Sequence, residues 1–263
     1  MPRQPRTKSK SKVYHCILRG INKQDIFFEK QDYFKFQEIL KRSKKIFSYK
    51  LYSYVLMPNH IHLEIKDEFH KLSKVMQHIA TSYAQYFNKK YKRTGHVFEN
   101  RYLSKNVETS SYILNLVRYI HQNPVKAGIG KIDKYVWSSY LEYLNINNIN
   151  EPIVDVEDIL SLFFLNKNEG IGAFLEFNKE DIKFESSIEL MDYEIKNRLK
   201  DEELIYFIRT QLGIKNIQEI QKYSANYRNE IIQKIKCIKG VTQQQISRVL
   251  GIHLRIIQRV RVK

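Results

Sequence analysis

Two histidines separated by one residue, His60 and His62, are the first side chains whose type and spacing suggest chemistry. They lie in the segment HIHLEI, which alternates between polar and apolar residues as a half-buried strand does. Side chains two apart on a strand point to the same face, so the two imidazoles could bind one metal ion. A divalent ion needs further ligands, and Glu64 continues the same face as a candidate ligand or acid–base group. Two ordinary surface histidines are the alternative.

A second candidate pair is Tyr119 and Asn123, in the segment RYIHQNP. Residues four apart share one face of a helix, so the phenol and the amide would point the same way. If that face packs over the histidine strand, Asn123 can give an oxygen ligand to the metal and Tyr119 a nucleophile. A phenol has an ordinary pKa near ~10, so attack at neutral pH needs a metal to polarise the target bond. The alternative is a tyrosine that only packs in the core.

The first half of the sequence alternates between strand and helix patterns, and these elements must position the candidate residues. The predicted strands are 14–20, 51–57, 60–65 and 102–107, and the predicted helices are 30–47, 72–91 and 110–123. Their order, β-α-β-β-α-β-α, predicts an α+β fold with a ferredoxin-like antiparallel sheet. We expect the last helix to end near Asn123, because Pro124 disfavours helical geometry in the residue before it.

Composition limits the class of protein. The chain has 263 residues, of which 43% are hydrophobic, so it can form a real core, and two domains are expected. No apolar run approaches the ~20 residues that span a bilayer, so no membrane association is expected. Two cysteines are too few for a disulfide framework or a cysteine zinc site, and a cytoplasmic location is expected. The basic start, residues 1–12, precedes no apolar stretch and predicts a flexible arm instead of a secretory signal.

Charge is unevenly distributed along the chain, whose formal net charge is +17. Residues 1–150 contain 27 Lys and Arg against 11 Asp and Glu. Residues 151–210 contain 7 against 15, and residues 211–263 contain 11 against 2. Two basic regions separated by an acidic one predict two surfaces that bind a polyanion.

From about residue 149 the pattern is mainly helical, and the end of the chain predicts a helix-turn-helix at about 240–263. Two helical stretches flank Gly251, with apolar residues spaced as in the core of that motif. Arg255, Gln258 and Arg259 would lie on or beside the second helix and are candidate DNA contacts. A helical hairpin with a basic surface is the alternative.

Several segments together resemble one family, the HUH-type single-tyrosine transposases, and most closely the REP-associated tyrosine transposases. The matching segments follow the order of that family: YHCILRGINKQDIFF (14–28), YVLMPNHIHLEI (54–65), GHVFENRYLSKNV (95–107), RYIHQNPVKAG (118–128) and VWSSYLEY (136–143). The resemblance covers roughly the first 145 residues. It implies a catalytic domain at 13–148, followed by a helical region at 149–263 that lies outside the resemblance.

The resemblance implies a chemistry as well as a fold. Tyr119 would be the nucleophile, His60 and His62 metal ligands, and Asn123 a third ligand for Mg²⁺ or Mn²⁺. Such enzymes cut single-stranded DNA beside a hairpin and form a 5′-phosphotyrosine, with no nucleotide cofactor. The chain departs from the family pattern at Glu64, where an apolar residue is expected, and at Asn100, where glycine is common.

Basic residues inside the matched segments are candidate contacts to DNA phosphates: Arg19, Arg101, Lys105 and Arg118. Two alternative functions stay open at this point. One is a non-catalytic DNA- or RNA-binding regulator that uses the basic half and the C-terminal helices. The other is a metal-dependent phosphodiesterase that activates water, with Glu64 as its base. The oligomeric state, monomer or homodimer, is also open.

Overall fold

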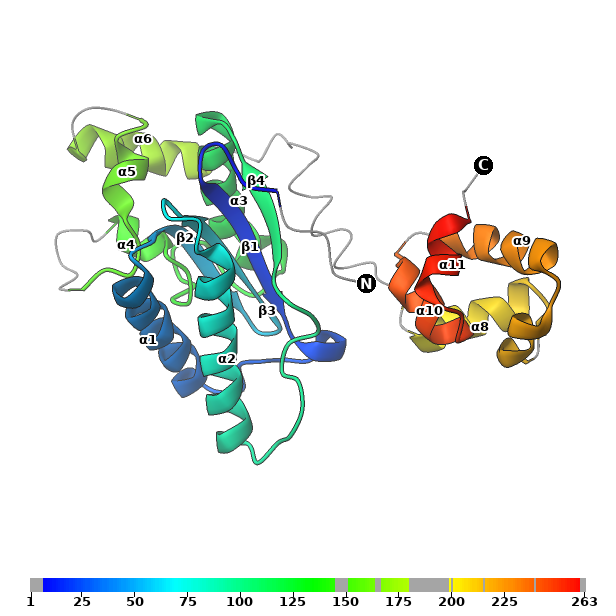
Figure 1. The fold of residues 1–263 in the computed structure, drawn as a ribbon. Helices are drawn as coiled ribbons and strands as arrows, with labels where there is room; N and C mark the ends of the chain where they lie inside the picture. The colour runs from blue at the N-terminus through cyan, green and yellow to red at the C-terminus, as the bar shows by residue number, and fades with distance from the viewer. Residues whose placement is uncertain are drawn as a thin grey trace. The chain divides into compact units, whose positions relative to one another are not determined.

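The computed structural model describes residues 7–144, 151–163, 167–179, 199, 201–214, 216–238 and 240–260. The chain forms two compact units, residues 1–183 and 184–263 (Figure 1). Residues 1–6 of the predicted basic arm and residues 261–263 of the predicted helix-turn-helix lie outside the described residues. Each unit is therefore considered by itself.

The first unit is built on a four-stranded antiparallel sheet with the strand order β2-β3-β1-β4. The strands are β1 (Val13–Arg19), β2 (Lys50–Met57), β3 (His60–Lys66) and β4 (Leu103–Val107). The helices between and after them are α1 (Lys30–Phe47), α2 (Leu72–Lys90) and α3 (Ser110–Lys126), with a short 3-10 turn, η1 (Ile21–Lys23), after β1. The predicted α+β class and the predicted order of these seven elements along the chain are confirmed. The order of the strands within the sheet is the one that the split βαβ pattern produces.

The two faces of the sheet contact different helices. Helices α1 and α2 pack side by side on one face (Figure 1). Helix α3 contacts β2 and β3 on the other face of the sheet. There the ring of its Tyr119 lies edge-on to the rings of His15 and His62. Alternation along β1 and β3 turns Cys16, Leu18 and other apolar residues toward α1 and α2. The polar residues of these strands therefore face α3.

Helix α3 extends beyond the predicted end at Asn123, and this prediction was wrong. Pro124 lies inside the helix, which continues to Lys126. A proline lacks one backbone donor, but the turn that follows it here is still hydrogen-bonded. The amide of Ala127 donates to the carbonyl of Asn123 at 3.0 Å, and the amide of Ile129 donates to Pro124 at 3.0 Å. The extra turn brings Lys126 onto the same helix as Tyr119.

Three further helices belong to the first unit: α4 (Tyr140–Leu144), α5 (Val156–Leu160) and α6 (Lys167–Lys179). Asp155 accepts a hydrogen bond from the backbone amide of Leu51 at 2.8 Å, and Asp158 forms an ion pair with Lys50 at 2.7 Å. These contacts join α5 to the edge strand β2. The domain boundary at 148/149 stays a prediction, although α5 packs on β2, and α6 packs on α3 and α5.

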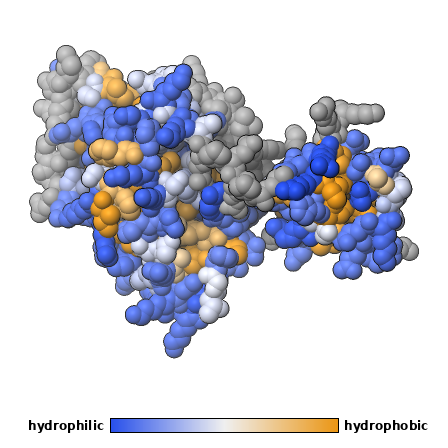
Figure 2. Space-filling view, in the orientation of Figure 1, coloured by the Kyte–Doolittle hydropathy of each residue, from blue (hydrophilic) through white to orange (hydrophobic). Residues whose placement is uncertain are grey.

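The second unit consists of α8 (Asp201–Gln211), η2 (Ile217–Lys222), α9 (Ala225–Lys236), α10 (Gln243–Leu250) and α11 (Leu254–Arg259). They enclose a separate core rich in isoleucine, including Ile208, Ile232, Ile235 and Ile257. Figure 2 shows hydrophilic side chains over most of the visible surface of each unit, with smaller hydrophobic patches. Among the described residues, no helix is both long and apolar enough to cross a bilayer.

A buried carboxylate fixes the start of α1. The side chain of Asp32 is fully buried and accepts hydrogen bonds from Lys90 at 2.6 Å and Tyr91 at 2.6 Å. It also accepts from the backbone amides of Phe28 and Glu29, which completes a capping box. Burial by itself raises the pKa of Asp32, but these hydrogen bonds outweigh it, and the pKa is lowered from its ordinary value. The carboxylate thus joins α1 to the end of α2.

Replacing Asp32 with asparagine should lower the free energy of unfolding by about 1.5–3 kcal/mol at neutral pH, because charge-assisted hydrogen bonds are lost. The folded-state pKa is depressed, so this contribution is present above the ordinary pKa near ~4 and is lost as the pH falls through the folded-state value. Urea unfolding followed by the fluorescence of Trp137 measures it. The exposed Glu38→Gln variant is the control. Equal midpoints for Asp32→Asn and wild type at pH 7 would contradict the prediction.

Candidate active site

The histidine pair lies on the face of the sheet that α3 covers. In the register of β1 with β3, His60 is opposite Arg19 and His62 is opposite Ile17. The two imidazole centroids are 5.0 Å apart. His62 is fully buried, whereas His60 is partly exposed at the end of the strand. The prediction that both rings share a face is confirmed.

The side chain of Asn59 fixes the tautomer of His60, and His15 contacts Nδ1 of His62. The Nδ1 of His60 lies 2.6 Å from Oδ1 of Asn59, which can only accept, so Nδ1 carries the proton and Nε2 the lone pair. The Nδ1 of His62 lies 2.9 Å from Nε2 of His15. If His62 donates in this contact, its Nε2 also presents a lone pair. Both rings can therefore adopt the form that binds a metal.

His15 is a site residue that the sequence did not identify as one. It is fully buried, and its ring stacks on that of His62 with centroids 5.2 Å apart. The spacing within YHCILRG gives no reason to associate it with a segment 47 residues later. Only the pairing of β1 with β3 places it there, two residues along the strand from the position opposite His62. His15 is thus placed to orient His62.

Tyr119 reaches this face from α3. Its ring lies edge-on to His62, with centroids 5.9 Å apart, and edge-on to His15 at 6.2 Å. The side chain is only 3% exposed. The exposed Lys126 places its ammonium 4.8 Å from the centroid of the Tyr119 ring. Lys126 was not a predicted site residue, because the helix was expected to end before it.

Asn123 lies one turn after Tyr119 and is also buried. Its Nδ2 donates to the carbonyl of Tyr119 at 3.0 Å, which fixes the orientation of the amide. The Oδ1 atom is the one that a metal would need. Its role as a third ligand stays a prediction.

Glu64 continues the face of His60 and His62 but is fully buried. It lies opposite His15 in β1 and Ser53 in β2, and the Ser53 hydroxyl donates to it at 2.9 Å. Burial raises the pKa of Glu64 well above its ordinary value, and the hydrogen bond from Ser53 offsets only part of this. Because Glu64 is fully buried and bonded to Ser53, this geometry does not favour it as a general base for a solvent water.

The side-chain donors at this site can be compared with those that a divalent metal ion needs. Within the described part of the chain, no three His, Cys, Asp or Glu side chains are grouped to hold a metal ion. The donors available are two imidazole nitrogens and an amide oxygen, a mixed set that suits several divalent ions. The tautomers of His60 and His62 fit such a role, and the choice between Mg²⁺ and Mn²⁺ stays open.

Two of the predicted phosphate contacts lie on the histidine face. Arg19 is opposite His60, and Lys105 in β4 is opposite His15, and both are partly exposed. Arg101 is exposed in the segment before β4. Their contacts with DNA stay predictions.

Arg118 is buried, whereas a residue that contacts a DNA phosphate must be accessible. It is 5% exposed, and its guanidinium lies 4.0 Å from the centroid of the Phe177 ring. It donates to the carbonyl of Phe177 at 3.1 Å and to Oδ1 of Asn115 at 2.8 Å. These contacts join α3 to α6. Arg118 would have to leave them to reach a phosphate, so its position favours a structural role.

Comparisons with known proteins agree with the motifs. Residues 8–123 match the family model described as "Transposase IS200 like", so this part of the chain is similar to the IS200-like transposases. The match includes His60, His62, Tyr119 and Asn123. Among curated proteins, none has a sequence that matches this chain.

Two solved structures are similar to the chain. One is a REP-associated tyrosine transposase bound to a REP hairpin, with a TM-score of 0.46 and 18% identity, covering 59% of this chain and 93% of that chain. The other, from Deinococcus radiodurans R1, is described as a candidate transposase. Its TM-score is 0.33 and its identity 14%, covering 46% of this chain and 96% of that one.

The Arg118→Ala variant should lower the free energy of unfolding by about 2–4 kcal/mol, because it removes a ring contact and two charged hydrogen bonds. Urea unfolding measures this loss. Arg101→Ala, at an exposed position, should change stability by no more than about 0.5 kcal/mol. An Arg118→Ala protein of wild-type stability with weakened binding to hairpin DNA would return Arg118 to the DNA-binding surface.

Proposed function

We propose that the chain is a metal-dependent transposase of the REP-associated tyrosine type, which cuts and rejoins single-stranded DNA beside a hairpin. One observation carries this proposal: the ring of Tyr119 lies against those of His15 and His62, although the tyrosine and the histidines are far apart in sequence. A phenol beside a potential metal site is what a tyrosine nucleophile requires. The five ordered sequence segments support the hairpin-associated substrate.

The reaction would exchange one phosphoester bond for another. The Oη of Tyr119 attacks the scissile phosphorus, and the bond from phosphorus to the 3′-oxygen breaks. The departing oxygen takes up a proton and becomes a free 3′-hydroxyl, while the phenol loses its proton and becomes a 5′-phosphotyrosine. A 3′-hydroxyl of the strand to be joined then attacks the phosphotyrosine and restores the phenol. No nucleotide cofactor is needed, because the phosphotyrosine conserves the bond.

The side chains around Tyr119 have separable roles in this proposal. His60, His62 and Asn123 would hold the metal, and His15 would keep the ring of His62 in the required tautomer and orientation. The bound metal would polarise the phosphodiester and stabilise the charge that develops in the transition state. Arg19 and Lys105 would bind flanking phosphates on the same face.

Lys126 supplies a positive charge beside the nucleophile. Its ammonium lies 4.8 Å from the ring centroid of Tyr119 and is exposed to solvent. A cation at this position favours a phenolate over a phenol and attracts a phosphate toward the ring. It would therefore assist the attack without being a metal ligand.

The Tyr119→Phe variant should form no covalent adduct with single-stranded hairpin DNA, because the attacking oxygen is absent. Labelled hairpins are mixed with the protein and Mg²⁺ or Mn²⁺, and denaturant-resistant bands are counted. The wild-type band should disappear in EDTA. Tyr112→Phe, on the same helix, is the matched control and should keep the band. An adduct that persists in Tyr119→Phe would refute the assignment and point to Tyr102 or Tyr112.

The Lys126→Gln variant should slow adduct formation by about tenfold or more, since one stabilising charge beside the transition state is lost. Lys126→Arg should retain most of the rate, because it keeps the charge. Single-turnover rates at saturating DNA separate this effect from weaker binding. Lys131→Gln, an exposed lysine in the following loop, is the control for net charge. Equal losses in Lys126→Gln and Lys131→Gln would show that only overall charge matters.

A further inference from the structure

The residues of the candidate site all come from the first unit. The IS200-like match covers residues 8–123, and His15, His60, His62 and Tyr119 all lie within it. The second unit has its own core of buried isoleucines and leucines. The helices of the second unit therefore need a functional explanation of their own.

Helices α10 and α11 have the geometry of a helix-turn-helix. Helix α10 ends at Leu250 and α11 begins at Leu254, so the turn has three residues, the usual length in this motif. Gly251 opens the turn with φ +64°, in the left-handed region. A Cβ there would collide with the side-chain amide of Gln221, whose Nε2 donates to the carbonyl of Leu250 at 3.0 Å. The positive φ thus favours glycine at 251, whereas the flexible side chain of Gln221 could move away from a Cβ.

Packing fixes which side of α11 faces outward. Ile252, Ile257 and Val260 are buried against the core of the unit, together with Ile246 and Leu250 of α10. Ile257 is the buried residue of α11 itself, so the helix cannot rotate about its axis without exposing this side chain. The side chains on its outer face are therefore presented in a fixed orientation.

The outer face of α11 carries Arg255, Gln258 and Arg259, all exposed. Positions three and four apart on a helix are neighbours, so the three side chains form one stripe. Among the described residues, no ion pair involves Arg255 or Arg259, whereas Arg248 of α10 is paired with Asp201 at 2.7 Å. Residues 231–263 contain no Asp or Glu. The stripe is thus cationic and has no acidic neighbour in sequence.

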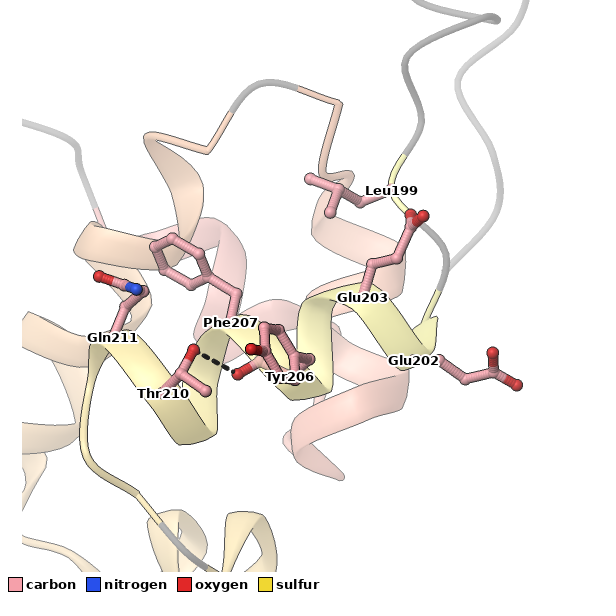
Figure 3. A pocket seen from close by; sticks show the side chains of 7 residues that line it. All are labelled: Leu199, Glu202, Glu203, Tyr206, Phe207, Thr210 and Gln211. Atoms are coloured by element: carbon pink, nitrogen blue, oxygen red, sulfur yellow. Dashed lines mark hydrogen bonds between the residues drawn. The ribbon is translucent and has the colours of Figure 1, made fainter.

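The opposite charge is concentrated on α8. Figure 3 shows a surface pocket along this helix, with Glu202, Glu203, Tyr206 and Thr210 among its lining residues. The Thr210 hydroxyl donates to the Tyr206 carbonyl at 2.8 Å. Two exposed carboxylates repel phosphate, so a polyanion would bind this unit through α11 and not through the α8 pocket.

We infer that the second unit binds double-stranded DNA, with α11 in the major groove. Guanidinium groups bind guanine edges and phosphates, and a glutamine amide pairs with the edge of adenine. Gln258 lies between Arg255 and Arg259 in this stripe. Its amide would contact a base edge, and the two guanidinium groups would anchor the helix on the DNA. This goes beyond the proposed catalysis, which concerns single-stranded DNA in the first unit. The chain would then hold a duplex and a hairpin-associated single strand through different surfaces.

The test uses the full chain with Tyr119→Phe as background, so that no DNA is cut. Random duplex DNA is selected for binding, and the affinity for an enriched duplex is measured by anisotropy over a range of salt concentrations. Arg255→Ala with Arg259→Ala should weaken binding more than tenfold and lower the slope of log affinity against log salt by about two. Gln258→Ala should reduce the preference at one base pair by about tenfold, with little change in non-specific affinity.

Arg209→Ala, an exposed arginine on α8, is the matched control and should leave duplex affinity and salt slope nearly unchanged. Arg255→Lys keeps the charge but not the bidentate geometry, so it should affect sequence preference more than salt dependence. Circular dichroism verifies that each variant is folded. The inference is overturned if no duplex is enriched, or if the α11 variants bind duplex as the Arg209→Ala control does. Adduct formation on hairpins, measured with Tyr119 intact, tests the catalytic proposal separately.

Discussion

The antiparallel pairing of β1 with β3 is the constraint on which the candidate site depends. Its register places Ile17 opposite His62 and Arg19 opposite His60, with His15 on the same face. A shift of one residue would turn every side chain of one strand to the opposite face and separate His15 from His62. The contact between these two histidines therefore follows from the backbone hydrogen bonds of the sheet. The apolar residues on the other face of the sheet hold this register, and so they also hold the histidines in place.

Helix α3 adds the second half of the site, and its position depends on contacts distant from the histidines. Arg118 stacks on Phe177 and so joins α3 to α6, which comes about 60 residues later in the chain. The proline in the last turn leaves the helix intact to Lys126. Seven residues make about two turns, so Lys126 returns to the side of Tyr119. One helix thus presents the phenol, the amide and the ammonium in a fixed order.

Some titratable side chains of the first unit are buried, and the cations near the candidate site are more exposed. Burial lowers the pKa of His121 to about 3, and its Nε2 lies 2.8 Å from the Ser139 hydroxyl, so this histidine is a neutral packing residue. Burial likewise raises the pKa of Glu64 above its ordinary value. The cations Arg19, Lys105 and Lys126 are at least partly exposed. This arrangement leaves these cations accessible to solvent and avoids unpaired charges in the interior.

Local periodicity determined much of this protein. Alternation put His60 and His62 on one face, helical spacing paired Tyr119 with Asn123, and the order of elements gave the sheet topology. The ordered motifs predicted a resemblance to the tyrosine transposases, and residues 8–123 match the model of the IS200-like transposases. The role of His15, the burial of Arg118 and the position of Lys126 were decided only by tertiary structure. They depend on which strand pairs with which and on which helix covers the sheet. Such contacts join residues tens of positions apart, and local spacing carries no information about them.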